Sequence, residues 1–361
     1  MVAIAKPCLG VEEKEAVTQV IDSGMIASGA VVEEFNHKFS EYIGVKHGIA
    51  TSNGTTALEV ALKALGIGPG DKVLTTPFSF IASTNSILYA GAIPLFADID
   101  PKTFNIAPDK MEDKLKKYRD IKALQIVHLF GQACDMDAIM TLVKKYGLLL
   151  IEDCAQAHGA LFGNKKVGTF GDAAAFSFYP TKNMTTGEGG MVVTNNDNAA
   201  ERSSLLINHG MKIRYHHDII GYNYRMTNVA ASIGLCQLKK LDGFNKRRNQ
   251  NAEYYNKNIN NQYVQVPYKQ GNVYHCYHQY TILVKDGRRD DFTKYLSANN
   301  VGSSVFYPLS IPEQKCYEGM DIERDFPVTD KVKLEVVSIP VHPLLSQDEL
   351  STVAGVINAY K

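Results

Sequence analysis

The sequence lacks both a net charge and a long apolar run. Its 38 lysine and arginine residues balance 38 aspartate and glutamate residues, so no overall field attracts nucleic acid or an anionic membrane. No stretch of about 18 apolar residues is present to form a membrane-spanning helix. The opening segment MVAIAKPCLGVEEKEAV is acidic where a secretory signal needs an apolar core. We therefore expect a cytoplasmic protein whose partners are neither nucleic acid nor a membrane.

Cysteine pairs and two common nucleotide-binding motifs are also missing. The six cysteines are spread along the chain without a C-x-x-C pair, which argues against a disulfide framework. The Gly-containing segment SNGTTAL is neither a P-loop nor a G-x-G-x-x-G fingerprint, so ATP and NAD are poorly supported. What is present is 361 residues, 45% of them apolar and 21% charged. This composition is typical of a folded protein of about two domains.

The order of apolar and amphipathic segments predicts the fold. In the first two thirds of the chain, short apolar runs alternate with segments whose apolar residues recur every three or four positions. This alternation predicts an α/β fold with a mostly parallel central sheet between helices. A long helical segment from Met226 to Ile259 suggests a division into a large domain, 1–244, and a small C-terminal α+β domain, 245–361. In the small domain we expect strands at 277–284 and 301–306.

Three segments at predicted strand ends carry the polar residues of interest, because ligands of such sheets bind there. In SNGTTAL, Gly54 and Thr55 begin a helix whose free N–H groups suit a phosphate, although an ordinary capped helix has the same pattern. In IEDCAQAHGA, Asp153 ends a buried strand and needs a positive partner, which a structural salt bridge would also provide. In SFYPTKNMTTGEGG, Lys182 is either a solvated side chain or, if desolvated, a nucleophilic amine.

Taken together, the three segments match the needs of one cofactor. A phosphate cradle is followed by a buried carboxylate, and a lysine follows 29 residues after that carboxylate. Pyridoxal 5'-phosphate needs its phosphate held, its pyridine nitrogen kept protonated by an acid, and its aldehyde captured by a lysine. The sequence therefore predicts a pyridoxal phosphate enzyme.

The sequence resembles the DegT/DnrJ-type nucleotide-sugar aminotransferases, which belong to the fold-type-I pyridoxal phosphate enzymes. The resemblance runs nearly end to end and rests on eight segments in the family's order. They are IAKPCLGVEEKEAVTQVIDSG, SNGTTALEVAL, GIGPGDKVLTTPFSFIAS, GAIPLFADID, IEDCAQAHGA, FSFYPTKNMTTGEGG, NHGM and GYNYRMTNVAASIGLCQL.

The resemblance implies a role for each matching residue at the cofactor. Lys182 would hold the cofactor as a Schiff base and move the proton, and Asp153 would pair with the pyridine nitrogen. Gln156 would contact the ring oxygen, and Phe80 would stack on the ring. The phosphate would be held by Gly54, Thr55 and Ser177.

Other implied roles concern a second subunit and the sugar. Asn223, in GYNYR, would reach the phosphate of the neighbouring subunit, which implies a homodimer with shared active sites; Arg225 is an alternative for this role. His209 and Tyr215 would lie near the sugar. We expect no metal, since adjacent histidines in a polar loop seldom form a complete site.

The implied reaction is a ping-pong transamination through pyridoxamine phosphate. An amino acid, expected to be L-glutamate, would supply the amino group, and a nucleotide-linked keto-sugar would receive it. Relatives that act at C4 of a 4-keto-6-deoxy sugar often read GYNYRM, as here, while C3-acting relatives tend to read N-S-R, so we favour a perosamine-synthase-like 4-aminotransferase. Amination at C3 and a lyase or dehydratase of the same fold are the alternatives; the family's dehydratases carry a histidine in place of Lys182. The nucleotide, GDP, UDP or dTDP, stays open.

Overall fold

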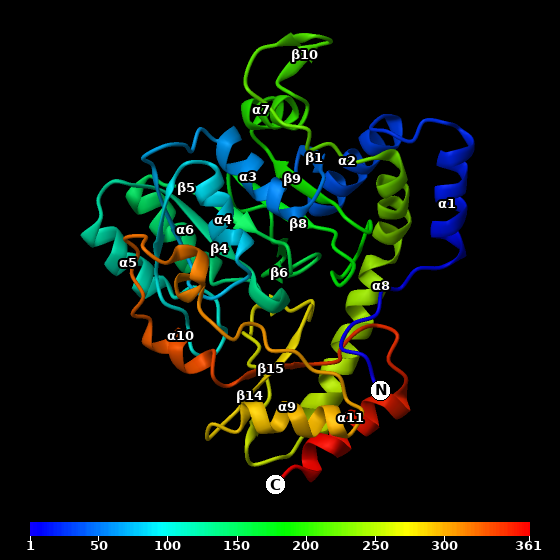
Figure 1. Cartoon of the computed structure of the whole chain (residues 1–361), viewed down its shortest axis with the longest axis vertical. Coiled ribbons are helices and arrows are strands. Elements are labelled where there is room, and N and C mark those ends of the chain that lie inside the picture. Colours follow the sequence, from blue (N-terminus) through cyan, green and yellow to red (C-terminus); the bar gives the residue numbers. More distant parts are fainter.

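A seven-stranded sheet forms the centre of the larger part of the molecule, as the computed structural model of residues 1–361 shows (Figure 1). The strands lie in the order β1–β9–β8–β5–β4–β2–β3, and all neighbours are parallel except where β9 pairs with β1 and β8. The predicted α/β fold with a mostly parallel sheet is confirmed. The strands are β1 (His47–Thr51), β2 (Lys72–Thr75), β3 (Ile93–Phe96), β4 (Ile121–Val127), β5 (Leu149–Asp153), β8 (Ala173–Ser177) and β9 (Gly190–Thr194).

Helices cover both faces of this sheet. Neighbouring residues of β5 point to opposite sides, so that Leu150 joins one apolar core and Ile151 the other. This burial on both faces explains why the strands read as continuous apolar runs. The Ile151 side packs against α3 (Gly54–Ala64), α4 (Ala82–Tyr89) and α7 (Asp197–Ile207), and the Leu150 side against α2 (Ala30–Ile43), α5 (Pro108–Lys117), α6 (Met136–Tyr146) and α8 (Asn228–Asn258).

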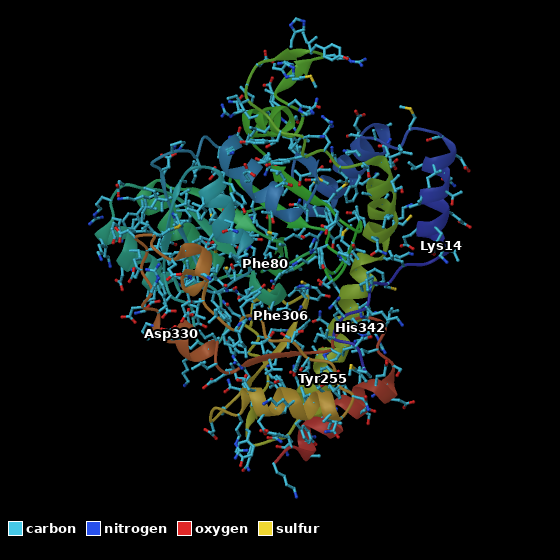
Figure 2. The ribbon with its side chains drawn as sticks, in the orientation of Figure 1. Lys14, Phe80, Tyr255, Phe306, Asp330 and His342 are labelled. Atoms are coloured by element: carbon cyan, nitrogen blue, oxygen red, sulfur yellow. The ribbon has the colours of Figure 1, made fainter.

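Helix α8 joins the two parts of the molecule (Figure 1). Its first half contributes Leu241 to the large core, and its second half contributes Ala252 and Tyr255 to a separate core. Tyr255 lies in the lower part of Figure 2, within the smaller unit. The predicted boundary between residues 244 and 245 thus falls inside one continuous helix, and Val2 at the other end of the chain also lies in the second core.

The smaller unit contains a three-stranded antiparallel sheet with helices against it. Residues 301–306, predicted as a strand, form only the isolated bridges Val2–Val301 and Ser304–Ser338, so that prediction was wrong. The chain leaves the small sheet at this point. Phe306 and Tyr307 instead line a cavity at the large sheet. The elements of this unit are β12 (Val264–Gln265), β14 (Tyr280–Val284), β15 (Val336–Ile339), α9 (Arg289–Ala298), α10 (Pro327–Val332) and α11 (Gln347–Ala359).

The remaining elements lie at the periphery. A hairpin projects from the body beyond α7 (Figure 1) and leaves Ile213 and Tyr215 67% and 76% exposed. No helix is both long and apolar enough to span a membrane. The peripheral elements are α1 (Val11–Asp22), which packs on α8, a small sheet of β13 (Val273–Tyr274), β6 (Leu161–Phe162) and β7 (Lys165–Lys166), and the hairpin of β10 (Met211–Ile213) and β11 (His216–His217).

Candidate active site

A cavity of about 520 Å³ lies at the carboxyl ends of the central strands. The last residues of β4, β5 and β8, which are Val127, Asp153 and Ser177, form part of its wall. Phe80 and Phe306 line it from the two parts of the molecule and lie near each other in Figure 2. Seven of the ten residues assigned to the site from the sequence line this cavity: Gly54, Thr55, Phe80, Asp153, Gln156, Ser177 and Lys182.

The turn before α3 presents free backbone N–H groups to the cavity. Asn53 caps the helix, since its side-chain oxygen accepts a hydrogen bond from the Thr56 N–H at 2.9 Å. The N–H groups of Gly54 and Thr55 have no acceptor within the helix. A Cβ on residue 54 would lie 2.6 Å from Cβ of Ser177, so only glycine allows the helix start to approach β8 this closely. Together these groups form a cradle for an anion.

Asp153 presents a carboxylate to the cavity without a charged partner. Its oxygens accept hydrogen bonds from the Ser83 hydroxyl at 2.7 Å and the Ala155 N–H at 3.1 Å. Burial raises the pKa of Asp153, although these bonds and the charge of Lys182 act in the opposite direction. The salt bridge that the sequence left open as an alternative is absent at Asp153. A buried carboxylate of this kind favours a cationic ligand.

The neighbouring Glu152 points to the opposite face and has a structural role. Its carboxylate lies 2.9 Å from Nε2 of His128. The Cys134 N–H donates to Nδ1 of the same ring, so the imidazole proton is on Nε2 and faces Glu152. The carboxylate also accepts backbone hydrogen bonds from Gly168, Phe170 and Gly171. Every donor and acceptor of this pair is therefore used within the protein.

Lys182 lies in the loop after β8 and directs its amine at the cavity. The amine makes no hydrogen bond to the protein, and burial lowers its pKa to about 8, with Asp153 acting in the opposite direction. An unprotonated lysine amine is a nucleophile and a general base. The structure therefore favours the desolvated, reactive interpretation of Lys182 over the solvated one.

The structure adds residues that the sequence did not indicate. The Gln156 side chain accepts from the Phe130 N–H at 2.7 Å and donates to the Tyr307 hydroxyl at 3.1 Å. Tyr307 and His278 line the cavity from the smaller unit, and Ser83 lines it from α4. No local pattern marks these residues, because they reach the strand ends only through contacts between distant parts of the chain.

Three assigned residues lie outside the cavity. Asn223 is exposed on the segment before α8, and the alternative residue Arg225 donates to the Asn208 side-chain oxygen at 2.6 Å. The backbone N–H of His209 donates to the carbonyl oxygen of Tyr222. Tyr215 is in the projecting hairpin. None of the three lines the cavity.

The fold and the cavity define an α/β protein with a lysine, an aspartate and a helix N-terminus gathered at the strand ends of its sheet. The model of the DegT/DnrJ/EryC1/StrS aminotransferase family matches residues 7–358, and the chain belongs to this family. It is 36% identical to the GDP-perosamine synthase of Vibrio cholerae, over 100% of this chain and 99% of the relative. It is 39% identical to the dTDP-3-amino-3,6-dideoxy-alpha-D-galactopyranose transaminase of Aneurinibacillus thermoaerophilus, over 97% and 95%.

A solved structure shows the same fold. The aminotransferase PseC of Helicobacter pylori, involved in the biosynthesis of pseudoaminic acid, superposes with a TM-score of 0.94 and 28% identity, over 99% of this chain and 98% of that one. Family and relatives agree that the chain is a transaminase, as the sequence predicted.

Proposed function

We propose that this transaminase uses pyridoxal 5'-phosphate to move an amino group from an amino acid to a nucleotide-linked keto-sugar. The observation that carries the proposal is the cavity itself. It unites the free amine of Lys182, the unpaired carboxylate of Asp153 and the anion cradle at Gly54 in a member of an aminotransferase family.

The residues present fit the cofactor. The cradle at Gly54, Thr55 and Ser177 suits its phosphate, and Asp153 suits a protonated pyridine nitrogen because this carboxylate has no other cationic partner in contact. Lys182 suits its aldehyde. When bound, the cofactor supplies a carbonyl that takes up the amino group and a cationic ring that withdraws electrons from the reacting carbon.

The chain's own residues then have separate tasks. Asp153 keeps the proton on the ring nitrogen, and the neighbouring cation in turn favours the ionised carboxylate. Lys182 takes a proton from the substrate carbon as a base and returns it as an acid, which a pKa of about 8 allows near neutral pH. Gln156 and Phe80 line the cavity and would contact the ring.

The substrate class is inferred from the relatives. Both curated relatives named above have names that describe nucleotide-linked amino sugars. The segment GYNYRM favours transfer to C4 of a 4-keto-6-deoxy sugar. The Aneurinibacillus relative is named for a 3-amino sugar and is 39% identical, so transfer to C3 is the second candidate. L-Glutamate is the proposed donor.

A panel of keto-sugars tests this proposal. The enzyme is loaded with pyridoxamine phosphate and incubated with 3-keto and 4-keto-6-deoxy sugars linked to GDP, UDP or dTDP, and products are read by mass spectrometry. We expect an amino sugar to form from a 4-keto substrate. The amount of amino sugar should equal the amount of enzyme-bound pyridoxamine phosphate that is used up. Amination of only the 3-keto sugars would overturn the C4 proposal, and amination of none would overturn the substrate class.

We propose further that two subunits share their active sites. Asn223 is exposed and free of side-chain hydrogen bonds, whereas Arg225 is engaged by Asn208. The hairpin nearby exposes Ile213 and Tyr215, and Ile220 beside it is 89% exposed. Apolar side chains gathered on a projecting element are typical of an interface, and a second copy of the chain related by a two-fold axis would bring Asn223 to its partner's phosphate cradle.

Mixing two inactive variants tests the shared sites. In a dimer of Lys182→Ala and Asn223→Ala subunits, one site has both defects and the other has neither. After subunit exchange, activity should rise above that of both parents, to about a quarter of wild type for random pairing. Lys182→Ala mixed with Asp153→Asn is the control, because both residues line the same subunit's cavity and no intact site can form. Equal results from the two mixtures, or an active monomer, would refute the shared sites.

A further inference from the structure

The side-chain amide of Gln156 has a fixed orientation in the cavity wall. Its Oε1 accepts the Phe130 N–H at 2.7 Å, and its Nε2 donates to the hydroxyl oxygen of Tyr307 at 3.1 Å. Because a backbone N–H can only donate, the end of the amide that faces Phe130 is the oxygen. Nε2 carries two hydrogens, and the bond to Tyr307 uses one of them. The other has no acceptor in the protein, although Gln156 is only 6% exposed and lines the cavity.

The Tyr307 hydroxyl is a second free donor. Its oxygen accepts from Nε2 of Gln156, and an amide nitrogen cannot accept, so the hydroxyl hydrogen points away from Gln156. No group of the protein accepts this hydrogen. Burial raises the pKa of Tyr307; the bond from Gln156 lowers it, and the charge of Asp153 raises it. The net shift is upward, so Tyr307 keeps its hydrogen at neutral pH.

Both donors are held in place by their surroundings. Phe130 has a φ of 57°, in the left-handed region that a bulky side chain rarely adopts, and its carbonyl accepts the Gln279 N–H at 3.2 Å. The ring of Tyr307 packs edge-on against Phe78 and Phe306, with centroids 6.1 and 5.8 Å away. The two donor atoms, 3.1 Å apart, therefore have defined positions in the cavity wall.

Two free donors this close together suit an anionic oxygen. The proposed cofactor has four polar groups, which are its phosphate, its ring nitrogen, its aldehyde and its ring oxygen. The cradle at Gly54, the carboxylate of Asp153 and the amine of Lys182 suit the first three. A protonated ring nitrogen withdraws electrons, so the ring oxygen is ionised and needs donors. Gln156 follows Asp153 by three residues at the same strand end.

We propose that Tyr307 is a cofactor-binding residue, whose hydroxyl donates to the ring oxygen of pyridoxal phosphate together with Nε2 of Gln156. The inference rests on the proposed use of this cofactor. The resemblance implies only the contact of Gln156, whereas Tyr307 reaches the site from 151 residues away. Tyr307 has two tasks, because it also holds the amide of Gln156 in the donating orientation.

Binding of two ring analogues to the full-length, cofactor-free chain tests the proposal. Deoxypyridoxine phosphate has a methyl group in place of the aldehyde and cannot react with Lys182, and its 3-deoxy derivative also lacks the ring oxygen. In calorimetry, the wild type should bind the oxygen-containing analogue about 100-fold more tightly, because each of two hydrogen bonds to an anionic oxygen contributes roughly tenfold. Equal affinity for the two analogues would overturn the proposal without any variant.

Two variants separate the donors. Tyr307→Phe removes one donor and keeps the ring, so the preference for the oxygen-containing analogue should fall to about tenfold while the affinity for the 3-deoxy analogue stays close to that of the wild type. Gln156→Glu keeps an acceptor for the Phe130 N–H but has no hydrogen to donate, and the preference should disappear. If Tyr307→Phe weakened the binding of both analogues alike, Tyr307 would have a structural role only, and the proposal would be wrong.

Tyr317→Phe is the matched control. The Tyr317 hydroxyl lies ten residues further along the same stretch of chain and donates to the Asn85 side-chain oxygen at 2.5 Å, but Tyr317 does not line the cavity. The preference should stay at about 100-fold in this variant, and a loss equal to that in Tyr307→Phe would count against the two-donor site. A chain that binds neither analogue would contradict the proposed cofactor and this inference together, whereas binding of both without preference would contradict this inference alone.

Discussion

Replacing Lys182 by alanine is expected to abolish amino transfer and leave the fold intact. The side chain makes no hydrogen bond to the protein and lines a cavity, so the packed cores lose nothing. Catalysis loses the only amine at the strand ends, and a positioned acid–base group by itself contributes about 10²–10⁴ in rate. We expect turnover to fall by at least that factor, measured in single-turnover assays, with an unchanged circular dichroism spectrum.

A covalent label identifies the reacting lysine independently. Borohydride reduction of the loaded wild type should attach the cofactor to the peptide that contains Lys182. Lys165→Ala is the control, because Lys165 is exposed in the short strand β7 and its replacement should affect neither label nor rate. Label on another lysine, or turnover retained in Lys182→Ala, would contradict the proposed mechanism.

Asp153→Asn is expected to slow transamination by orders of magnitude while the phosphate cradle and Lys182 still bind the cofactor. The neutral amide cannot hold a proton on the pyridine nitrogen, and each unit of lost pKa shift corresponds to about 1.4 kcal/mol. Single-turnover absorbance measurements separate binding from rate. Ser83→Ala is the control, because it removes the hydroxyl that donates to Asp153 and leaves the carboxylate. Near-normal rates in Asp153→Asn would mean that another acid protonates the ring.

Asp153→Asn should slow the reaction but stabilise the cofactor-free fold above the pKa of Asp153. In the cofactor-free protein, burial raises the pKa of Asp153, so the folded state binds more protons than the unfolded state between the two pKa values. Stability from this group is therefore present below the unfolded pKa and is lost as the pH rises through the folded pKa. Above that window, cofactor-free Asp153→Asn should unfold at a higher temperature than the wild type. A lower unfolding temperature at neutral pH would contradict this account of the carboxylate.

Much of the fold follows from local patterns in the sequence. Continuous apolar runs such as LLLIED predicted strands buried on both faces, and the structure places Leu150 and Ile151 in two different cores. The helical segment predicted from Met226 to Ile259 matches α8 (Asn228–Asn258). The predicted strand at 301–306 failed because strand formation depends on a pairing partner, and this segment finds only isolated bridges.

The candidate site also combines residues that local patterns predicted with properties that only the folded chain decided. Gly54, Asp153 and Lys182 were recognisable because each begins, ends or follows a regular element, and parallel strands bring their carboxyl ends to one edge. Whether Asp153 has a salt bridge and whether Lys182 is desolvated depended on distant neighbours, which no short segment contains.

The sequence by itself determined the alternation of strands and helices, the residues at the strand ends and the family to which they belong, because these depend on local periodicity and on ordered motifs. Only the tertiary structure decided that Tyr307 contacts Gln156 and that His278 contacts Asn183, pairs separated by 151 and 95 residues. Such contacts form where the two parts of the molecule, which α8 joins, pack against each other. No short segment of the sequence signals them. The orientation of His278 in the wall of the cavity is therefore a property of the folded chain.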